Sequence, residues 1–110
     1  MVKVLLIIVS GDEKADLGLR FAYNSVESGR FEDLKIVLFG PSQRRVLSYE
    51  GEMKKIFDEL RRRGVIDAAC VNVARSLGIE THLRDLGLNL EPIGNRIAYF
   101  LEKGYQAITF

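Results

Sequence analysis

The chain has 110 residues, of which 47% are hydrophobic and 28% charged, and its formal net charge is +1. This length and composition predict one globular domain with an ordinary core, and they exclude a disordered chain. Because the chain is almost neutral, we expect no direct binding to nucleic acid. One cysteine and one histidine exclude an internal disulfide and a Cys/His zinc cage. A lone free cysteine is typical of a reducing compartment, most simply the cytoplasm.

The first expected elements are a buried strand and a helix. Val2–Val9 is an almost continuous apolar run, typical of a parallel strand that is covered on both faces. The run is too short to cross a bilayer and no cleavage site follows it, so we expect neither a secretory signal nor membrane contact. Ser10 and Glu13 match an S-x-x-E capping box, and Gly29 is a typical helix end. A helix between them is therefore predicted.

The next segments predict a second strand and an amphipathic helix. Leu34–Phe39 is apolar and is closed by Gly-Pro. Residues 42–49, which include two arginines, are consistent either with a short helix or with a loop beside the carboxyl end of that strand. Apolar residues between Met53 and Leu60 recur at helical spacing. The following Arg61–Arg63 is expected to be a solvated helix end rather than a basic binding patch, since acidic residues precede it.

The second half of the chain repeats the order strand, helix, glycine, strand. The expected elements are a strand over Val65–Val71, a short helix over Val73–Leu77, an edge strand over Leu90–Ile93 that includes Pro92, a helix over 94–101 and a strand over Tyr105–Phe110. Residues 79–90 have mixed polarity and predict no clear element. Strands that alternate with helices predict a parallel sheet with helices on both faces and right-handed connections. The sequence therefore predicts a single α/β domain over residues 1–110.

Cys70 is the first candidate site residue. It ends an expected strand and precedes an expected helix, which places it at the carboxyl edge of the sheet, where open α/β sheets bind ligands. A thiol that faces a helix amino terminus has a lowered pKa and becomes a nucleophile. Asn72 is a candidate helix cap, and Arg75 is expected to lie near the thiol, so that the pocket would be polar and mildly positive. The alternative is that Cys70 is a small buried hydrophobic residue.

Other chemistries find less support in the sequence. The chain contains neither a phosphate-binding loop motif nor a dinucleotide fingerprint. The phosphate loop of low-molecular-weight tyrosine phosphatases separates its cysteine from its arginine by five residues, whereas only four lie between Cys70 and Arg75, which argues against a phosphatase. His82 lies twelve positions after the cysteine in a polar segment, and a surface role is favoured over that of a catalytic base.

The block Gly64–Ile79, which reads G-V-x4-C-V-N-V-A-R-S-L-G-I, resembles the cysteine segment of the DsrE/DsrF-like (YchN-like) sulfur-relay family. In that family a strand led by Gly-Val delivers a cysteine, and a short helix that ends at Gly-Ile or Gly-Val follows. Pro92–Phe110 is also similar to the family, with a turn, a helix that ends at glycine and a last hydrophobic strand. The earlier strand and turn are compatible but generic.

The resemblance implies a three-layer α/β/α fold with a five-stranded parallel sheet and assembly into trimers or hexamers. It also implies that Cys70 accepts sulfane sulfur from a donor protein as a persulfide and passes it to an acceptor, without a metal or another cofactor. We therefore expect a sulfur carrier or sulfurtransferase-like protein in which Cys70 is the reactive residue. The alternative is a non-catalytic oligomeric subunit or a small-ligand-binding module in which Cys70 only packs.

Overall fold

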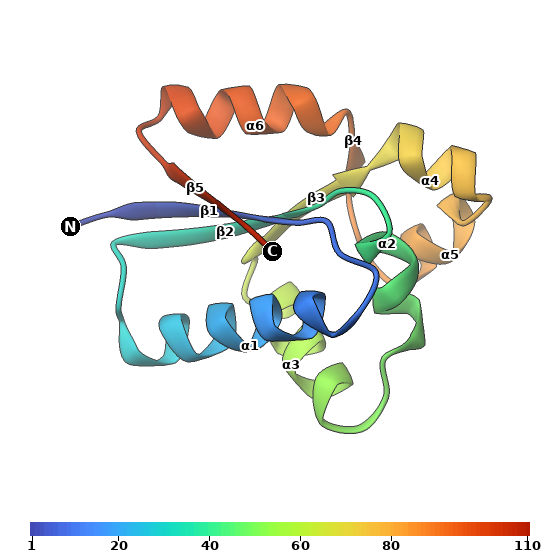
Figure 1. Ribbon diagram of the computed structural model, residues 1–110, viewed down its shortest axis with the longest axis horizontal. Helices are drawn as coiled ribbons and strands as arrows, with labels where there is room; N and C mark the ends of the chain where they lie inside the picture. Colours follow the sequence, from blue (N-terminus) through green and yellow to red (C-terminus); the bar gives the residue numbers. More distant parts are fainter.

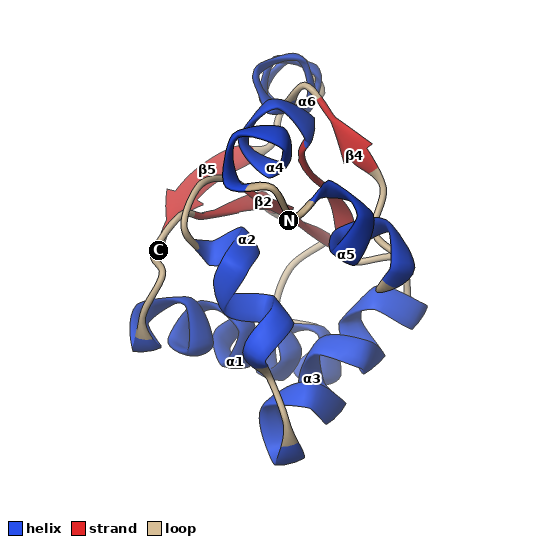
Figure 2. Ribbon diagram, turned by 90° about the vertical axis from the view of Figure 1, so that its right-hand side faces the viewer, coloured by secondary structure: helices blue, strands red, loops and turns tan.

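The computed structural model describes all 110 residues and confirms the predicted α/β architecture. A five-stranded, all-parallel sheet with the order β4-β3-β2-β1-β5 lies between two layers of helices (Figures 1 and 2). The strands are β1 (Lys3–Ile8), β2 (Asp33–Leu38), β3 (Ile66–Cys70), β4 (Leu90–Glu91) and β5 (Gln106–Thr109). The helices are α1 (Glu13–Ser28), α2 (Ser42–Arg45), α3 (Gly51–Arg62), α4 (Val71–Leu77), α5 (Glu80–Asp85) and α6 (Ile93–Glu102), with a 3-10 turn at Val46–Ser48.

The two faces of the sheet are covered unequally. In Figure 1, α1 and α3 lie below the sheet and α6 lies above it. A cluster of 21 buried residues fills the lower side and extends to α4 and α5. The cluster under α6 has six buried residues, which are Leu5, Val37, Ala68, Cys70, Ile93 and Phe100. Alternate residues of β1 and of β2 supply the two clusters, because successive side chains of a strand point to opposite faces.

The chain path brings the ends of the strands to one edge. From β1 to β4 each new strand is added on the same side, and α6 then returns the chain to pair β5 with the other side of β1. All carboxyl ends therefore point the same way, toward α2 and α4 on the right of Figure 1, and Figure 2 views the molecule from that edge. None of the helices has the combination of length and apolarity that crossing a bilayer requires.

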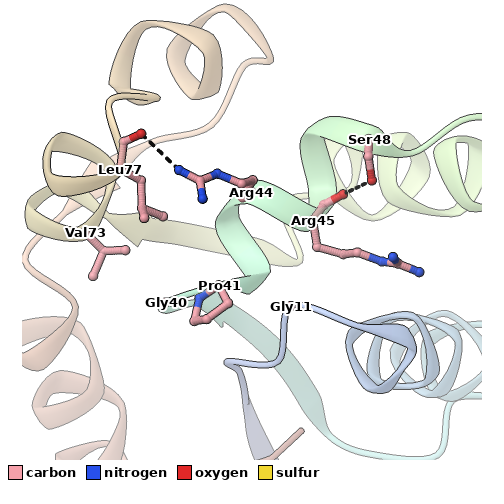
Figure 3. A pocket seen from close by; sticks show the side chains of 8 residues that line it. All are labelled: Gly11, Gly40, Pro41, Arg44, Arg45, Ser48, Val73 and Leu77. Atoms are coloured by element: carbon pink, nitrogen blue, oxygen red, sulfur yellow. Dashed lines mark hydrogen bonds between the residues drawn. The ribbon is translucent and has the colours of Figure 1, made fainter.

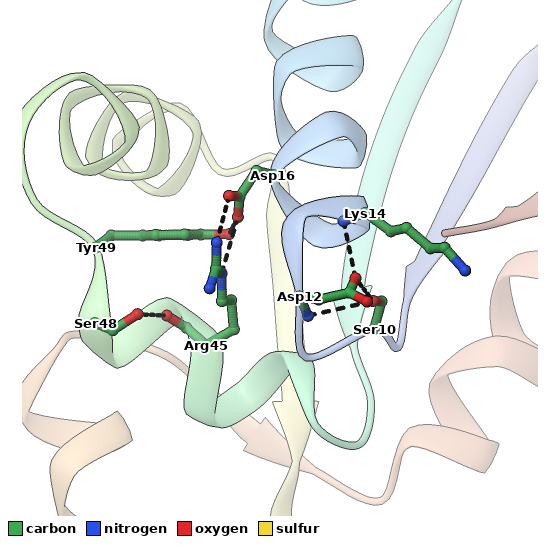
Figure 4. Close-up of polar contacts among 7 residues, drawn as sticks. All are labelled: Ser10, Asp12, Lys14, Asp16, Arg45, Ser48 and Tyr49. Carbon is green, nitrogen blue, oxygen red and sulfur yellow. Dashed lines mark hydrogen bonds and ion pairs between the residues drawn. The ribbon is translucent and has the colours of Figure 1, made fainter.

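Two predictions of helix caps need correction. The N-cap of α1 is Asp12 and not Ser10: the Asp12 carboxylate accepts a hydrogen bond from the Lys14 N–H at 3.0 Å, and the Ser10 hydroxyl donates to that carboxylate (Figure 4). A carboxylate is favoured here because it interacts with the positive end of the helix dipole. The hydrogen bond from Ser10, followed by that from Lys14, lowers the pKa of Asp12. The α4 helix begins at Val71, so Cys70 rather than Asn72 is its N-cap residue.

The segment that the sequence left open is helical. Residues 42–48 form α2 and the 3-10 turn, which lie beside the carboxyl ends of β1 and β2. Two buried side chains attach α2 to the sheet, because the Ser42 hydroxyl donates to the carbonyl oxygen of Ile8 at 2.6 Å and Gln43 bonds to neighbouring main chain. The Ser42 hydrogen bond adds to a main-chain one, since the Ile8 carbonyl oxygen also accepts from the Phe39 N–H at 3.0 Å.

Candidate functional site

Cys70 lies where the sequence places it, as the last residue of β3 and the residue that precedes α4. Its side chain is only 5% exposed and belongs to the apolar cluster under α6. The thiol makes no capping hydrogen bond to α4. Ile7 and Val73 are half-buried and pack against the same cluster. The surroundings of the thiol are therefore apolar, which is the environment of a packing cysteine.

The main chain at Cys70 is held by Gln43, which is fully buried. Its side-chain Nε2 donates to the carbonyl oxygen of Cys70 at 2.9 Å, and its Oε1 accepts from the Gly40 N–H at 2.9 Å. One amide side chain thus connects the loop after β2 to the end of β3. Since both main-chain groups bond to the same side chain, the two strand ends are fixed relative to each other.

The two predicted neighbours of the thiol face solvent instead. Asn72 is exposed on the first turn of α4, and the Arg75 Nε donates to the Glu80 carboxylate at 3.1 Å. Hydrogen bonds from Arg84 and then from Arg75 lower the pKa of Glu80. Neither Asn72 nor Arg75 lines a cavity, so the polar pocket expected around the thiol is not formed by them. Helical spacing alone does not tell which face of a short helix is turned inward.

His82 is exposed on α5, and no polar side chain bonds to it. No three histidine, cysteine, aspartate or glutamate side chains lie close enough together to share a metal ion. The structure therefore assembles no Cys-His pair at the carboxyl edge.

An open groove of about 420 Å³ lies at this edge (Figure 3). Loops and helices from four parts of the chain form it: the loop after β1, the loop after β2, the α2 region and α4. The lining residues are Gly11, Gly40, Pro41, Arg44, Arg45, Ser48, Val73 and Leu77. A Cβ atom at Gly11 would lie 2.7 Å from the Cβ of Pro41, so only glycine allows these two loops to approach so closely. We call this site the carboxyl-edge groove.

The two arginines of the groove differ in their partners. The Nη2 of Arg44 donates to the carbonyl oxygen of Leu77 at 3.2 Å, which connects α2 to α4, and Arg44 makes no ion pair (Figure 3). Arg45 points away from α4 and binds the Asp16 carboxylate of α1 through Nε at 3.3 Å and Nη2 at 2.7 Å. The positive charge of Arg45 is thus compensated, whereas that of Arg44 is not.

Tyr49 completes the pair between α1 and α2. Its hydroxyl donates to Asp16 at 2.7 Å (Figure 4). The Arg45 guanidinium holds the pKa of Asp16 below its usual value, and the Tyr49 hydroxyl acts in the same direction. Burial, followed by the hydrogen bond to Asp16, raises the pKa of Tyr49. This network of Asp16, Arg45 and Tyr49, which we call the α1–α2 brace, supports one wall of the groove.

Val73 lies between the groove and the thiol. Its side chain lines the groove and also packs against the cluster that contains Cys70, whereas Cys70 itself does not line the groove. Sequence reasoning missed the groove because its residues are far apart in the chain and form no known motif. The available signals were the Gly40-Pro41 turn at a strand end and the Arg44-Arg45 pair that follows it.

The comparisons with known proteins support the fold but assign no family. No family model matches the sequence, and no curated protein matches it. Among solved structures, the conserved protein of unknown function BT1422 from Bacteroides thetaiotaomicron superposes with a TM-score of 0.81 over 98% of this chain and 94% of that one, at 19% sequence identity. At this identity the similarity establishes a shared fold and carries no function from one protein to the other.

Proposed function

We propose that this protein is a small-ligand-binding module, that the carboxyl-edge groove is its binding site, and that Cys70 is a packing residue of β3. One observation carries the proposal: the carboxyl-edge groove is open and lies at the sheet edge, while the thiol is enclosed in the cluster under α6. Parallel α/β sheets bind ligands at this edge, and about 420 Å³ lies within the usual range for small-molecule sites.

The walls of the groove are preformed, which favours binding. Ser42 fixes α2 to β1, Gln43 joins the loop after β2 to β3, and the α1–α2 brace holds the far side of α2. A ligand that enters such a site orders few groups, so it loses little conformational entropy on binding.

A fragment screen by NMR tests this function. Ligands should shift the amide signals of Gly11 and Gly40 and the methyl signals of Val73 and Leu77. Leu77→Trp should fill the groove and abolish these shifts, whereas Leu17→Trp, at an exposed position of α1, should leave them unchanged. Fragments that bind only elsewhere, or equally well to the Leu77→Trp variant, would contradict the proposal.

A second candidate is the sulfur carrier that the family resemblance implies. The observation in its favour is that the only thiol of the chain lies at a strand end, beside a helix start, with the half-buried Val73 between it and the groove. In such a carrier the Cys70 thiolate attacks the outer sulfur of a donor persulfide. A new Sγ–S bond forms, the S–S bond of the donor breaks, and the donor leaves as a thiolate. An acceptor thiolate then takes the sulfur in the same way, so no cofactor is required.

Measuring the alkylation rate of Cys70 against pH, followed by intact mass after exposure to a persulfide donor, separates the two functions. A carrier should react in the native state, because the thiolate is the nucleophile, and should gain one sulfur atom. Val73→Ala should speed the reaction if Val73 limits access, whereas Arg75→Gln serves as a control on the exposed side of α4. A thiol that reacts only after denaturation would exclude the carrier and leave the binding module. A reducing compartment, such as the cytoplasm, is compatible with both functions.

We also propose that the protein forms a homo-oligomer, for which the resemblance implies a trimer or hexamer. Apolar side chains that are exposed on α6 and β5 support this: Tyr99 is 44%, Leu101 51% and Ile108 39% exposed. Sedimentation at micromolar concentration should show the assembly, and Leu101→Lys should weaken it, with Leu17→Lys as the matched control. A wild-type monomer would contradict the proposal.

A further inference from the structure

We infer that the carboxyl-edge groove selects a small ligand with a single oxyanion group, such as a carboxylate, on an apolar body, and that Arg44 is the residue that recognises the anion. This inference rests on the proposed binding function and specifies the class of its ligand. It follows from the charges of the groove, from the unused hydrogen-bond donors of Arg44 and from the apolar part of the lining.

The charge of the groove comes from one side chain. Arg44 and Arg45 are the only charged residues in the lining, and no carboxylate lines it. The Asp16 carboxylate neutralises Arg45 and occupies its Nε and Nη2. What remains is the uncompensated charge of Arg44, within a hollow that concentrates its field on a bound ligand.

Most of the hydrogen-bond donors of Arg44 have no partner in the protein. A guanidinium carries five N–H groups, and the structure uses one nitrogen of Arg44, for the carbonyl oxygen of Leu77. That hydrogen bond positions the planar group at the boundary between α2 and α4 (Figure 3). A planar guanidinium with free N–H groups fits a carboxylate or phosphate oxygen pair with two parallel hydrogen bonds.

The rest of the groove limits the ligand to one anionic group and an apolar part. Pro41, Val73 and Leu77 provide apolar walls. Asp12, the N-cap of α1, and Glu13, its first residue, come just after Gly11, and their negative charges disfavour a second negative group on that side, as in a diphosphate. An aromatic or branched aliphatic acid has the matching distribution of charge and apolar surface.

NMR titrations with three probes test the inference: phenylacetate, its neutral isostere phenylacetamide, and acetate. Phenylacetate should shift the signals of Gly11, Gly40, Val73 and Leu77 with about tenfold higher affinity than phenylacetamide, which is the effect expected of one charge-assisted hydrogen-bond pair. Acetate should bind more weakly than phenylacetate, because it lacks the apolar body.

The matched variants are Arg44→Gln and Lys55→Gln, which remove one positive charge each. Lys55 is exposed on α3 and has no ion pair, so its loss leaves the groove intact. Arg44→Gln should abolish the tenfold preference for phenylacetate and keep the affinity for phenylacetamide, whereas Lys55→Gln should keep both. Equal affinities of phenylacetate and phenylacetamide for the wild type, or a preference that survives Arg44→Gln, would overturn the proposed anion selectivity. The proposed ligand-binding function of the groove would not be affected by either result. Absence of any shift at the groove with all three probes would overturn both proposals.

Discussion

The face of the sheet that packs against α1 and α3 has a cluster of 21 buried residues, whereas the face under α6 has six, including Cys70. A single helix covers the second face, so apolar side chains in this layer, such as Ile7 of β1 and Ile97 of α6, are only half-buried. The first face should therefore supply most of the free energy of folding, since that energy grows with the apolar area removed from water. Substitutions on the second face should therefore lower the free energy of unfolding by less than substitutions on the first.

The largest expected effect compares two adjacent leucines. Leu5 and Leu6 are both fully buried on β1, but Leu5 faces α6 and Leu6 faces α1. Replacing a buried leucine by alanine costs about 2–5 kcal/mol, depending on how far the surroundings relax into the cavity. We expect the loss of stability to lie near the upper end of this range for Leu6→Ala and near the lower end for Leu5→Ala. Urea unfolding measures both losses. Equal losses would show that the two faces are packed equally well.

The second prediction concerns the edge where the two faces meet. Gln43→Leu keeps the size of the side chain but removes its hydrogen bonds to the Cys70 carbonyl oxygen and the Gly40 N–H. The Cys70 carbonyl oxygen, at the N-cap of α4, still accepts the first hydrogen bond of that helix. Leaving the Gly40 N–H without a partner should cost about 1–3 kcal/mol, a loss close to that of Leu5→Ala. Urea unfolding measures the loss. A change below that range would mean that water or another group satisfies the Gly40 N–H.

A smaller loss is expected at the cysteine itself. Cys70→Ala removes one buried sulfur atom from the cluster under α6 and leaves no polar group without a partner. The free energy of unfolding should fall by about 1 kcal/mol, as for a modest core truncation. Ligand shifts at the groove should remain as in the wild type, because Val73 and not Cys70 lines it. Loss of these shifts would show that the thiol and the groove act as one site.

The smallest effect is a pH dependence from the α1–α2 brace. The folded-state pKa of Asp16 is lowered by Arg45, so ionised Asp16 stabilises the folded protein. This contribution is complete above the unfolded-state pKa of about 3.9 and is lost as pH falls through the lower folded-state pKa. Asp16→Asn should therefore be less stable than the wild type at neutral pH and approach it in acid, as followed by urea midpoints. A difference that stays constant with pH would assign the loss to packing.

Much of the fold could be predicted because the relevant signals are local. The apolar run Val2–Val9 and the glycines after the long helices indicated strands and helix ends, and Pro92 correctly marked an edge strand. The position of Cys70 between β3 and α4 was predicted from the same pattern. The cap at Asp12 was missed because Ser10 and Glu13 match the capping-box motif. In the structure, the Asp12 carboxylate rather than the Ser10 hydroxyl accepts the hydrogen bond from the helix main chain.

The site could not be predicted as well, because it depends on orientation and on distant contacts. Ala68, Ala69 and Cys70 are all buried, so the strand offers no polar alternation from which the direction of the thiol could be read. Asn72 and Arg75 were assigned to the thiol by their proximity in sequence, yet α4 turns both outward. Arg44 of α2 lies against α4 only in the folded chain, where it donates to the carbonyl oxygen of Leu77.

The position of β1 within the sheet has a consequence for the order of folding. β1 pairs with β2 on one side and with β5 on the other, so contacts such as Leu5 with Ala107 join residues about one hundred positions apart. Strands β1 to β4 can associate before β5 exists as a chain segment, but one edge of the most apolar strand then stays open. Unpaired edges of this kind promote association with other chains. During synthesis, we therefore expect the interval before β5 is added to be a period in which the chain is prone to aggregate.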